Sequence, residues 1–239
     1  MKYLRKFENH AAYEAAESGL ILSNVSLCAQ ENEVHYNPYV DPYNGHAYVD
    51  LGLPSGTKWA TMNVGASSET DYGLYFAWGE TDGYADASTK AFSWSDYKYG
   101  DGSTFTKYNS TDGKTVLDLE DDAVAANWGG SWKIPTDAQF QELLNTTYVT
   151  NTWVTDYQGS GVNGRLFTSV TNGNTLFIPA AGRAGNGSMY YIDTRGVVWS
   201  SSLYSSDVKY GNYSHFYNSG VYIDYSGRCN GQSVRGVVG

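Results

Sequence analysis

The stretch NWGGSWKIPTDAQFQELL, residues 127–144, decides how the middle of this chain folds. Thr136 is followed three residues later by Gln139, which is the spacing of a capping box at the start of a helix. Phe140 and Leu143 then begin an apolar stripe at helical spacing. The sequence therefore predicts a helix that begins near Thr136 and buries one side.

Short strands are predicted on both sides of this helix. The chain of 239 residues holds 22 Tyr and 27 Gly, a composition that favours strands and tight turns over long helices. Residues 46–239 are expected to form one α+β domain, with the last strands running beside the first. Strands are predicted at 47–51, 148–155, 164–170, 175–179 and 197–201, with a shorter helix at 118–126 and a hairpin near the end.

The first 45 residues differ from the rest. Residues 1–36 predict a small module of one short helix and two short strands, which is too small to bury much core alone. Residues 37–45, NPYVDPYNG, contain two prolines and an Asn-Gly pair and predict a linker. We expect the small module to attach the chain to other copies of itself or to a larger assembly. The N-terminal basic residues are followed by no apolar stretch, so this segment does not resemble a secretory signal.

Charge and cysteine content exclude several classes of protein. The net charge is −10 and the isoelectric point is near 4.7, so binding to phosphate backbones or to anionic membranes is not expected. No run of about 18 apolar residues occurs, so membrane insertion is not expected either. Cys28 and Cys229 lie far apart and have no metal-ligand spacing, which predicts two free thiols.

Several ordered motifs resemble a known family. They are YVDLGLPSGTKWA at 48–60, NWGGSWKIPT at 127–136, FIPAAG at 177–182, WSSS at 199–202 and GQSVR at 231–235. Together they resemble the fibrobacter-type major paralogous domain, which is similar to the formylglycine-generating-enzyme branch of the C-type lectin fold. The resemblance covers about residues 46–239 and implies a C-type lectin-like fold with a small N-terminal helix and strand appendage.

A second resemblance concerns function. A Trp-Ser-Ser-Ser stretch, a polar tract and a Ser-Val-Arg tail resemble the variable proteins of diversity-generating retroelements. That resemblance implies a ligand-binding protein whose surface at about 204–227 varies, with a protein or glycan on a host cell as its partner. The N-terminal part resembles short modules of phage structural proteins, which implies a receptor-binding protein on the virion that assembles as a trimer. A bacterial surface adhesin or lectin of the same fold remains the alternative.

The polar tract itself predicts a hairpin with two different faces. Asn218-Ser219-Gly220 has the residues of a tight turn. Because strand side chains alternate between faces, Val221, Ile223 and Phe216 are expected to point to the core. The opposite face then shows Tyr213, His215, Tyr217, Tyr222 and Asp224.

This exposed face has the chemistry of an antibody paratope. Tyrosine gives a large rigid contact with a polar tip, and small polar residues adapt around it. Tyrosines packed on each other or on a neighbouring chain are the structural alternative. The residues expected to bind the ligand, including loop residues that extend the patch, are Tyr204, Asp207, Tyr210, Tyr213, His215, Tyr217, Tyr222, Asp224, Tyr225 and Ser226.

No metal, cofactor or catalytic site is predicted. The acidic run Asp118, Glu120, Asp121 and Asp122 suits either a hard cation such as calcium or the N-terminus of a helix, and the helix is favoured. Formylglycine-generating chemistry needs paired cysteines, and Cys229 has no near partner in sequence. The adjacent Arg228 would lower the pKa of Cys229, but a buried, unreactive thiol is the favoured prediction. Trp132 and Trp199 are expected in the core, and Arg235 is expected to pair with a buried carboxylate.

Overall fold

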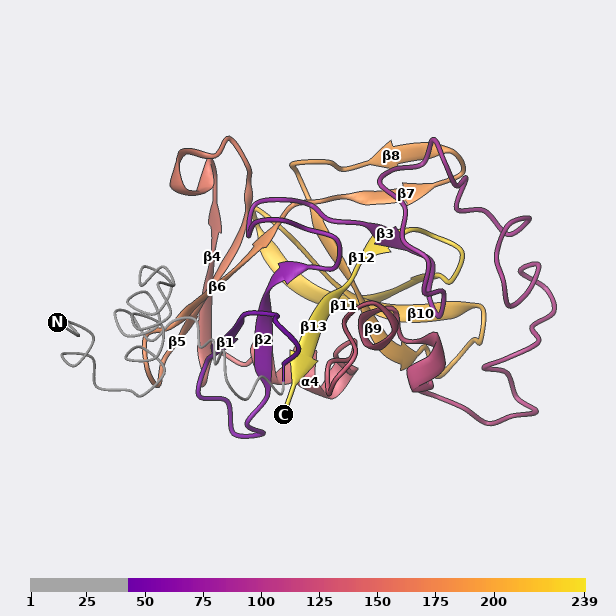
Figure 1. The fold of residues 1–239 in the computed structure, drawn as a ribbon, viewed down its shortest axis with the longest axis horizontal. Helices are drawn as coiled ribbons and strands as arrows, with labels where there is room; N and C mark the ends of the chain where they lie inside the picture. The colour runs from indigo at the N-terminus through magenta and orange to yellow at the C-terminus, as the bar shows by residue number, and fades with distance from the viewer. Residues whose placement is uncertain (1–42) are drawn as a thin grey trace, which may run out of the picture.

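The computed structural model describes residues 43–239, which form a mixed α/β fold made mostly of strands with two α-helices (Figure 1). The predicted N-terminal module, residues 1–36, lies outside the described residues, as does most of the predicted linker, residues 37–45. The predicted domain boundaries therefore stay predictions.

The two ends of the described chain meet in a three-stranded sheet. Its order is β1 (Tyr48–Asp50), β2 (Lys58–Asn63) and β13 (Arg235–Val238), with both pairs antiparallel. Trp59 of β2 lies opposite Val49 on one side and opposite Val237 on the other. The prediction that the last strand runs beside the first is therefore wrong, because β2 lies between β1 and β13. The turn after β1 folds β2 back on it, and β13 pairs with the other edge of β2.

The remaining strands form a five-stranded sheet, a three-stranded sheet and a small hairpin. Each strand for which bounds were predicted begins and ends within two residues of those bounds. The five-stranded sheet has the order β11 (Gly220–Gly227), β10 (Tyr210–Tyr217), β9 (Gly196–Leu203), β12 (Gln232–Ser233) and β3 (Tyr75–Phe76). The three-stranded sheet consists of β4 (Val149–Val154), β5 (Gly164–Ser169) and β6 (Thr175–Pro179). The small hairpin is β7 (Arg183–Gly185) with β8 (Ser188–Tyr190), drawn above β10 and β11 in Figure 1.

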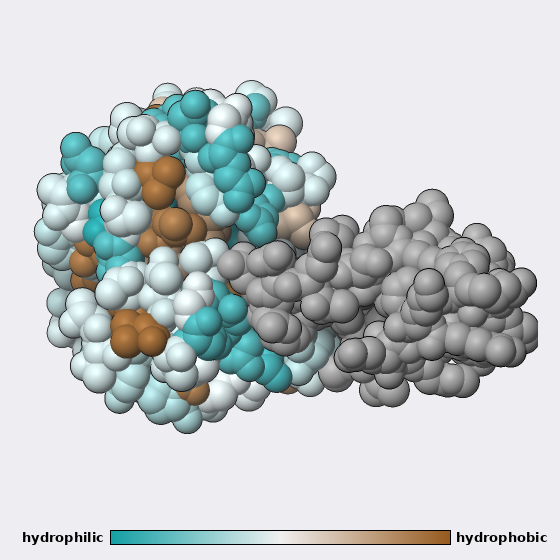
Figure 2. Space-filling view, turned by 90° about the vertical axis from the view of Figure 1, so that its left-hand side faces the viewer, coloured by the Kyte–Doolittle hydropathy of each residue, from teal (hydrophilic) through white to brown (hydrophobic). Residues whose placement is uncertain are grey.

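The central strands are covered on both faces. Trp59 contributes to the hydrophobic core that also holds Phe140 and Phe216, whereas its neighbour Ala60 contributes to the core around Trp132 and Trp199. Adjacent residues of one strand point to opposite faces, so the two cores share the same strands. Burial of Trp132 and Trp199 confirms the prediction for these residues. On the outside, Figure 2 shows mostly hydrophilic and neutral residues, with a small group of hydrophobic residues near the middle of the coloured surface.

The predicted capping box is confirmed. Helix α4 (Asp137–Leu143) begins after Thr136, whose side chain accepts a hydrogen bond from the Gln139 backbone. The Gln139 side chain in turn accepts from the Thr136 backbone N–H at 2.9 Å. The apolar stripe is buried as expected, because Phe140 and Leu143 are each 1% exposed.

The predicted helix at 118–126 is instead two shorter elements. A 3-10 turn, η2 (Leu119–Asp121), is followed by α3 (Ala123–Trp128). Asp122 between them has an extended backbone, and its carboxylate accepts from the backbone N–H groups of Val124 and Ala125. A single continuous helix would leave no residue free to cap α3 in this way.

Among residues 43–239, Arg235 pairs with no carboxylate, contrary to the prediction. Its buried guanidinium donates to the side-chain oxygen of Asn63 at 2.9 Å and to the backbone oxygen of Ala60 at 2.9 Å. A third bond reaches the backbone oxygen of Phe177 at 3.4 Å. Neutral oxygens that strand geometry already places there thus satisfy the donors of this buried cation.

Candidate ligand-binding surface

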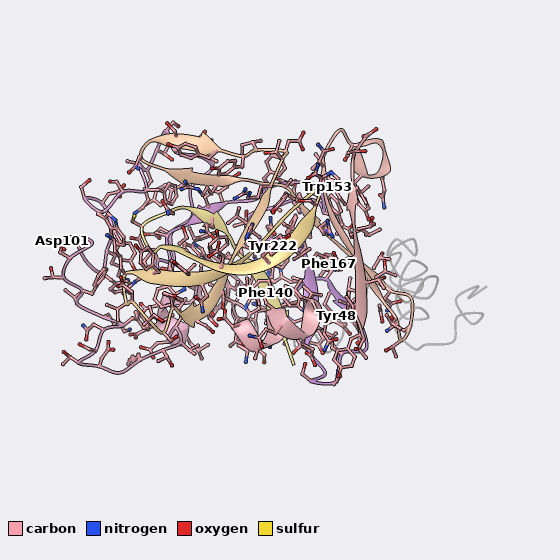
Figure 3. All side chains as sticks on the ribbon, turned by 180° about the vertical axis from the view of Figure 1, so that it is seen from behind. Tyr48, Asp101, Phe140, Trp153, Phe167 and Tyr222 are labelled. Atoms are coloured by element: carbon pink, nitrogen blue, oxygen red, sulfur yellow. The ribbon has the colours of Figure 1, made fainter. Side chains whose placement is uncertain are left out.

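The predicted alternation of the hairpin is confirmed. β10 and β11 are joined by a two-residue turn at 218–219, with Tyr213 opposite Asp224 and His215 opposite Tyr222. These four residues and Tyr217 share one side of the hairpin, which we call the tyrosine face. Figure 3 shows Tyr222 on β11 on the side of the molecule opposite to that of Figure 1.

The opposite side of the hairpin points to the core, as predicted. Phe216 is 1% exposed, and Val221 and Ile223 pack against the same core while staying half-buried. Ile223 is therefore less central to the core than the alternation alone predicts. It lies on β11, which is the edge strand of its sheet and is covered less completely than β10.

The rings of the tyrosine face contact one another. The His215 ring lies 5.4 Å from Tyr213 and 5.4 Å from Tyr222, and Tyr217 stacks on Tyr222 at 5.7 Å between ring centres. The face is thus a continuous aromatic surface with hydroxyl tips, the arrangement that suits adaptable recognition.

Exposure along this face is uneven. Tyr222 is 46% exposed and Asp224 is exposed, whereas Tyr213 and Tyr217 are half-buried. His215 is only 8% exposed, so the prediction that it is an exposed contact is wrong. The neighbouring tyrosine rings cover it, which strand alternation alone does not reveal.

The predicted patch divides into two groups. Tyr225 lies opposite Asn212 in the hairpin register, so both point to the Phe216 side and not to the tyrosine face. Tyr225 is 44% exposed and stacks on Tyr204 at 4.0 Å, with Tyr210 at 5.1 Å. These three tyrosines form a second aromatic cluster, which we call the hairpin-end cluster.

The two remaining predicted residues, Asp207 and Ser226, lie in different parts of this region. Asp207 is exposed in the loop between β9 and β10 and accepts a hydrogen bond from the Lys209 backbone at 2.9 Å. Ser226 alternates with Tyr222 and Asp224 and belongs to the tyrosine face, where Asn230 donates to its hydroxyl at 2.8 Å.

The tyrosine face borders a cleft with two hollows. The first, about 210 Å³, lies beside Tyr213 and Ser226; the second, about 350 Å³, lies beside Tyr217. Tyr191 and Arg195 line both hollows. These residues lie between β8 and β9, so this segment forms a wall beside the hairpin.

Sequence reasoning missed this wall. Arg183, Tyr191 and Arg195 precede the polar tract and belong to no motif quoted for the family. One signal was present: Tyr190, Tyr191 and Ile192 are consecutive large hydrophobic residues in a polar segment, and all three are exposed.

Comparisons with known proteins identify no relative. No family model, curated protein or solved structure matches the chain. The site must therefore be argued from its own residues.

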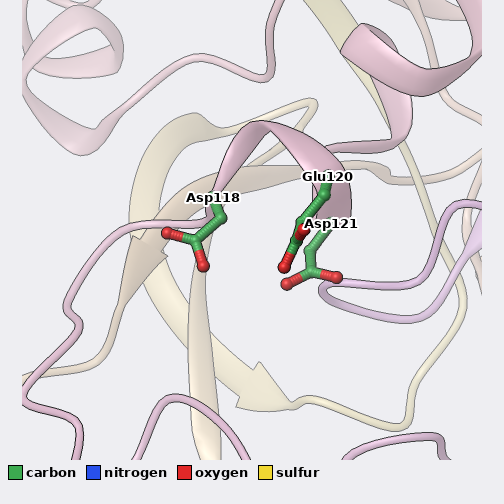
Figure 4. Close-up of side chains that lie close together, drawn as sticks. All are labelled: Asp118, Glu120 and Asp121. Atoms are coloured by element: carbon green, nitrogen blue, oxygen red, sulfur yellow. The ribbon is translucent and has the colours of Figure 1, made fainter.

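The acidic run holds a lysine. The carboxylates of Asp118, Glu120 and Asp121 converge (Figure 4), and the Lys107 ammonium lies 2.9 Å from Asp118 and 2.6 Å from Glu120 and also bonds Asp121. Burial opposes the charge of Lys107, but hydrogen bonds with the three carboxylates raise its pKa. The Lys107 ammonium thus lies among the three carboxylates and balances one of their three charges. The fourth acid of the run, Asp122, caps α3, in line with the favoured helix reading.

Cys229 is a buried thiol, as favoured. It is 6% exposed, and burial raises its pKa to about 11. Arg228 does not activate it, because the guanidinium donates to the Tyr97 hydroxyl and to backbone oxygens instead. The thiol is therefore protonated and unreactive near neutral pH.

Within residues 43–239, no helix is long and apolar enough to cross a membrane.

His215 should make stability depend on pH between about 7 and 5. Burial lowers its pKa below the ordinary 6.5, the charge of Arg195 lowers it further, and Asp224 partly opposes this. The unfolded chain then binds a proton more readily, so the free energy of unfolding falls as pH drops through 6.5.

Urea unfolding of wild type and His215→Gln at several pH values checks this prediction. Burial raises the pKa of Asp122 to about 6, so Asp122 titrates in the same range. Both proteins carry Asp122, and the difference between them isolates His215. A difference that stays constant from pH 7 to 5 would contradict the prediction.

Proposed function

We propose that this chain is a ligand-recognition protein of C-type lectin-like fold, which binds a protein or glycan on a host cell surface through the tyrosine face and its cleft. The observation that carries the proposal is where exposed hydrophobic side chains gather. Eight large hydrophobic residues are exposed in the described chain, and four belong to the tyrosine face or to the segment from β8 to β9 beside it. These four are Tyr190, Tyr191, Ile192 and Tyr222.

Such a concentration favours binding over a structural role. Exposed aromatic residues contribute little to folding, and a contiguous group of them is typical of an interaction site. The core side of the same hairpin holds the backbone through Phe216. The exposed side chains are therefore free to differ between copies, as the resemblance to retroelement-diversified proteins implies.

The wider setting forms part of the same proposal. Pairing of the terminal strand β13 with β2 brings the ends of the described chain together, which supports the C-type lectin-like fold. We propose that the protein is displayed on a phage particle as a homo-oligomer, a trimer by the resemblance of residues 1–36 to phage modules. A bacterial surface adhesin of the same fold is the second setting in which this surface would act.

Cell staining tests the proposal. Fluorescently labelled full-length protein is mixed with a bacterial community of many species, and stained cells are sorted and identified. Tyr222→Ala should weaken staining of those cells about tenfold or more, because central aromatic anchors contribute most binding energy.

Leu119→Ala is the matched control. Leu119 is 68% exposed, lies in η2 and lines neither hollow, so its loss should leave staining unchanged. Equal staining by Tyr222→Ala and wild type would overturn the assignment of the face. Absence of staining on every member of the community would overturn the proposed host surface.

A further inference from the structure

Two arginines beside the tyrosine face have no acidic partner. Arg183 and Arg195 both line the 210 Å³ hollow. Within residues 43–239, neither guanidinium makes an ion pair or a hydrogen bond. Each lies over a tyrosine ring instead, Arg183 at 4.8 Å from Tyr190 and Arg195 at 4.6 Å from Tyr191.

Two free guanidinium groups are unusual in so acidic a chain. The protein has 25 Asp and Glu against 15 Lys and Arg. Among the described residues, the ammonium groups of Lys90, Lys98, Lys107 and Lys114 each lie within 4.0 Å of a carboxylate. Asp193, which lines the second hollow, bonds the Tyr72 hydroxyl at 3.2 Å and the Asn163 backbone at 2.9 Å and not Arg195. The fork of guanidinium donors is therefore available to a ligand, and it matches the two oxygens of a carboxylate.

We propose that this hollow binds the carboxylate of an acidic sugar. The inference rests on the proposed function, because it names the ligand class of the same surface. Arg183 and Arg195 supply the charge, and both favour the ionised form of a bound carboxylate at neutral pH.

The lining favours a sugar over an acidic peptide. Tyr191 and Tyr213 offer ring faces, Ser226 and Asn230 offer hydroxyl and amide groups, and Val197 is the one aliphatic side chain of the lining. Anchor side chains of protein ligands fill desolvated apolar pockets, and this lining offers none. Sugar rings present apolar faces and hydroxyl edges, which match aromatic and polar groups placed side by side.

The second hollow gives room for a neighbouring sugar. It shares Arg195 and Tyr191 with the first and adds Trp153 and Tyr217, two further rings. Its volume of about 350 Å³ suits another ring of an oligosaccharide. The proposed ligand is therefore the acidic end of a glycan that continues along the tyrosine face.

A glycan array tests this inference. Labelled full-length protein is applied to oligosaccharides that carry sialic, glucuronic or galacturonic acid, to their neutral parents, and to an immobilised oligoglutamate peptide. Acidic glycans should bind at least about tenfold more tightly than their neutral parents, because a bidentate ion pair is lost in the neutral compound.

Variants assign the binding to the two arginines. Arg183→Gln and Arg195→Gln should each weaken binding of the acidic glycans about tenfold, while their melting temperatures stay within about 2 °C of wild type. Lys98→Gln is the control: its ammonium lies over the Tyr99 ring at 4.7 Å, outside both hollows and outside residues 204–227, and its loss should leave binding unchanged.

Several results would overturn the inference. These are equal binding of acidic and neutral glycans, binding of oligoglutamate alone, no binding of any acidic glycan, or full binding by both arginine variants. Cell staining separates this failure from failure of the proposed function. If the array shows no acidic preference while Tyr222→Ala still weakens staining, the surface binds ligands but the arginine hollow does not select acidic sugars.

Discussion

Replacing Arg228 by Met should lower the free energy of unfolding by about 3–5 kcal/mol, because several buried oxygens lose their hydrogen-bond donor at a cost of about 1–3 kcal/mol each. Arg228 is fully buried just after β11. It donates to the Tyr97 hydroxyl at 2.8 Å and to the backbone oxygens of Val208 at 2.9 Å and Lys107 at 3.0 Å. Methionine keeps the approximate length of the side chain but leaves these oxygens without donors.

The position of Arg228 explains why the loss should be large. Its guanidinium lies 4.7 Å from the ring of Phe105 and 5.1 Å from that of Trp78. It thus joins the segment at 97–108 to the open end of the hairpin, because Val208 precedes β10 and Arg228 follows β11.

Urea unfolding of Arg228→Met checks the size of the effect. Arg228→Lys should recover only part of the stability, because an ammonium cannot reproduce the planar fork. Arg183→Met serves as the control, since Arg183 is half-buried and bonds no oxygen among the described residues, and it should change stability by about 0.5 kcal/mol or less. A loss below about 1 kcal/mol for Arg228→Met would show that the network does not hold the hairpin.

Replacing Phe216 by Ala should cost about 3–5 kcal/mol, as truncation of a buried aromatic side chain does. Phe216 lies opposite Gly196 in the sheet, and a Cβ atom at Gly196 would lie 1.9 Å from the Phe216 ring. The ring therefore covers the glycine directly, and it also packs edge-on against Phe167 at 6.3 Å. Its removal would leave a cavity between β9, β10 and β5.

Alanine substitutions at Ile223 and Tyr222, in the neighbouring strand, give losses of stability with which that of Phe216→Ala can be compared. Ile223→Ala should cost only about 1–2 kcal/mol, less than its position in the alternation suggests, because Ile223 is half-buried. Tyr222→Ala should cost about 0.5 kcal/mol or less, because Tyr222 is 46% exposed. Equal losses for Tyr222→Ala and Phe216→Ala in urea unfolding would show that the tyrosine belongs to the core.

Local sequence patterns predicted local structure well. The capping box at Thr136 and Gln139 satisfies its own backbone, so it needs no distant partner. The turn at 218–219 fixes the hairpin register, and the register fixes which side chains share a face. The tyrosine face could therefore be predicted from the sequence.

Features that depend on contacts between distant parts of the chain could not be predicted from the sequence. Burial of His215 depends on three tyrosine rings around it. Tyr225 was predicted as a loop residue, but β11 extends to Gly227 and places Tyr225 on the Phe216 side. Lys107 reaches the acidic run from a different loop, so the run alone favoured no particular cation. Arg183 and Arg195 approach the hairpin only because β7, β8 and the segment before β9 fold beside it.

A position-by-position substitution scan of residues 204–227 tests whether the tyrosine face is free to vary. Each position is varied to all other amino acids on displayed protein, and resistance to protease reports folding. We expect Tyr222, Asp224 and Tyr225 to accept nearly every residue, whereas Phe216 and Gly211 should accept almost none. Gly211 belongs with the intolerant positions because a Cβ atom there would lie 2.6 Å from the buried Trp78 ring. If Tyr222 and Asp224 prove as intolerant as Phe216, the face is part of the folded core and cannot serve as a variable binding surface.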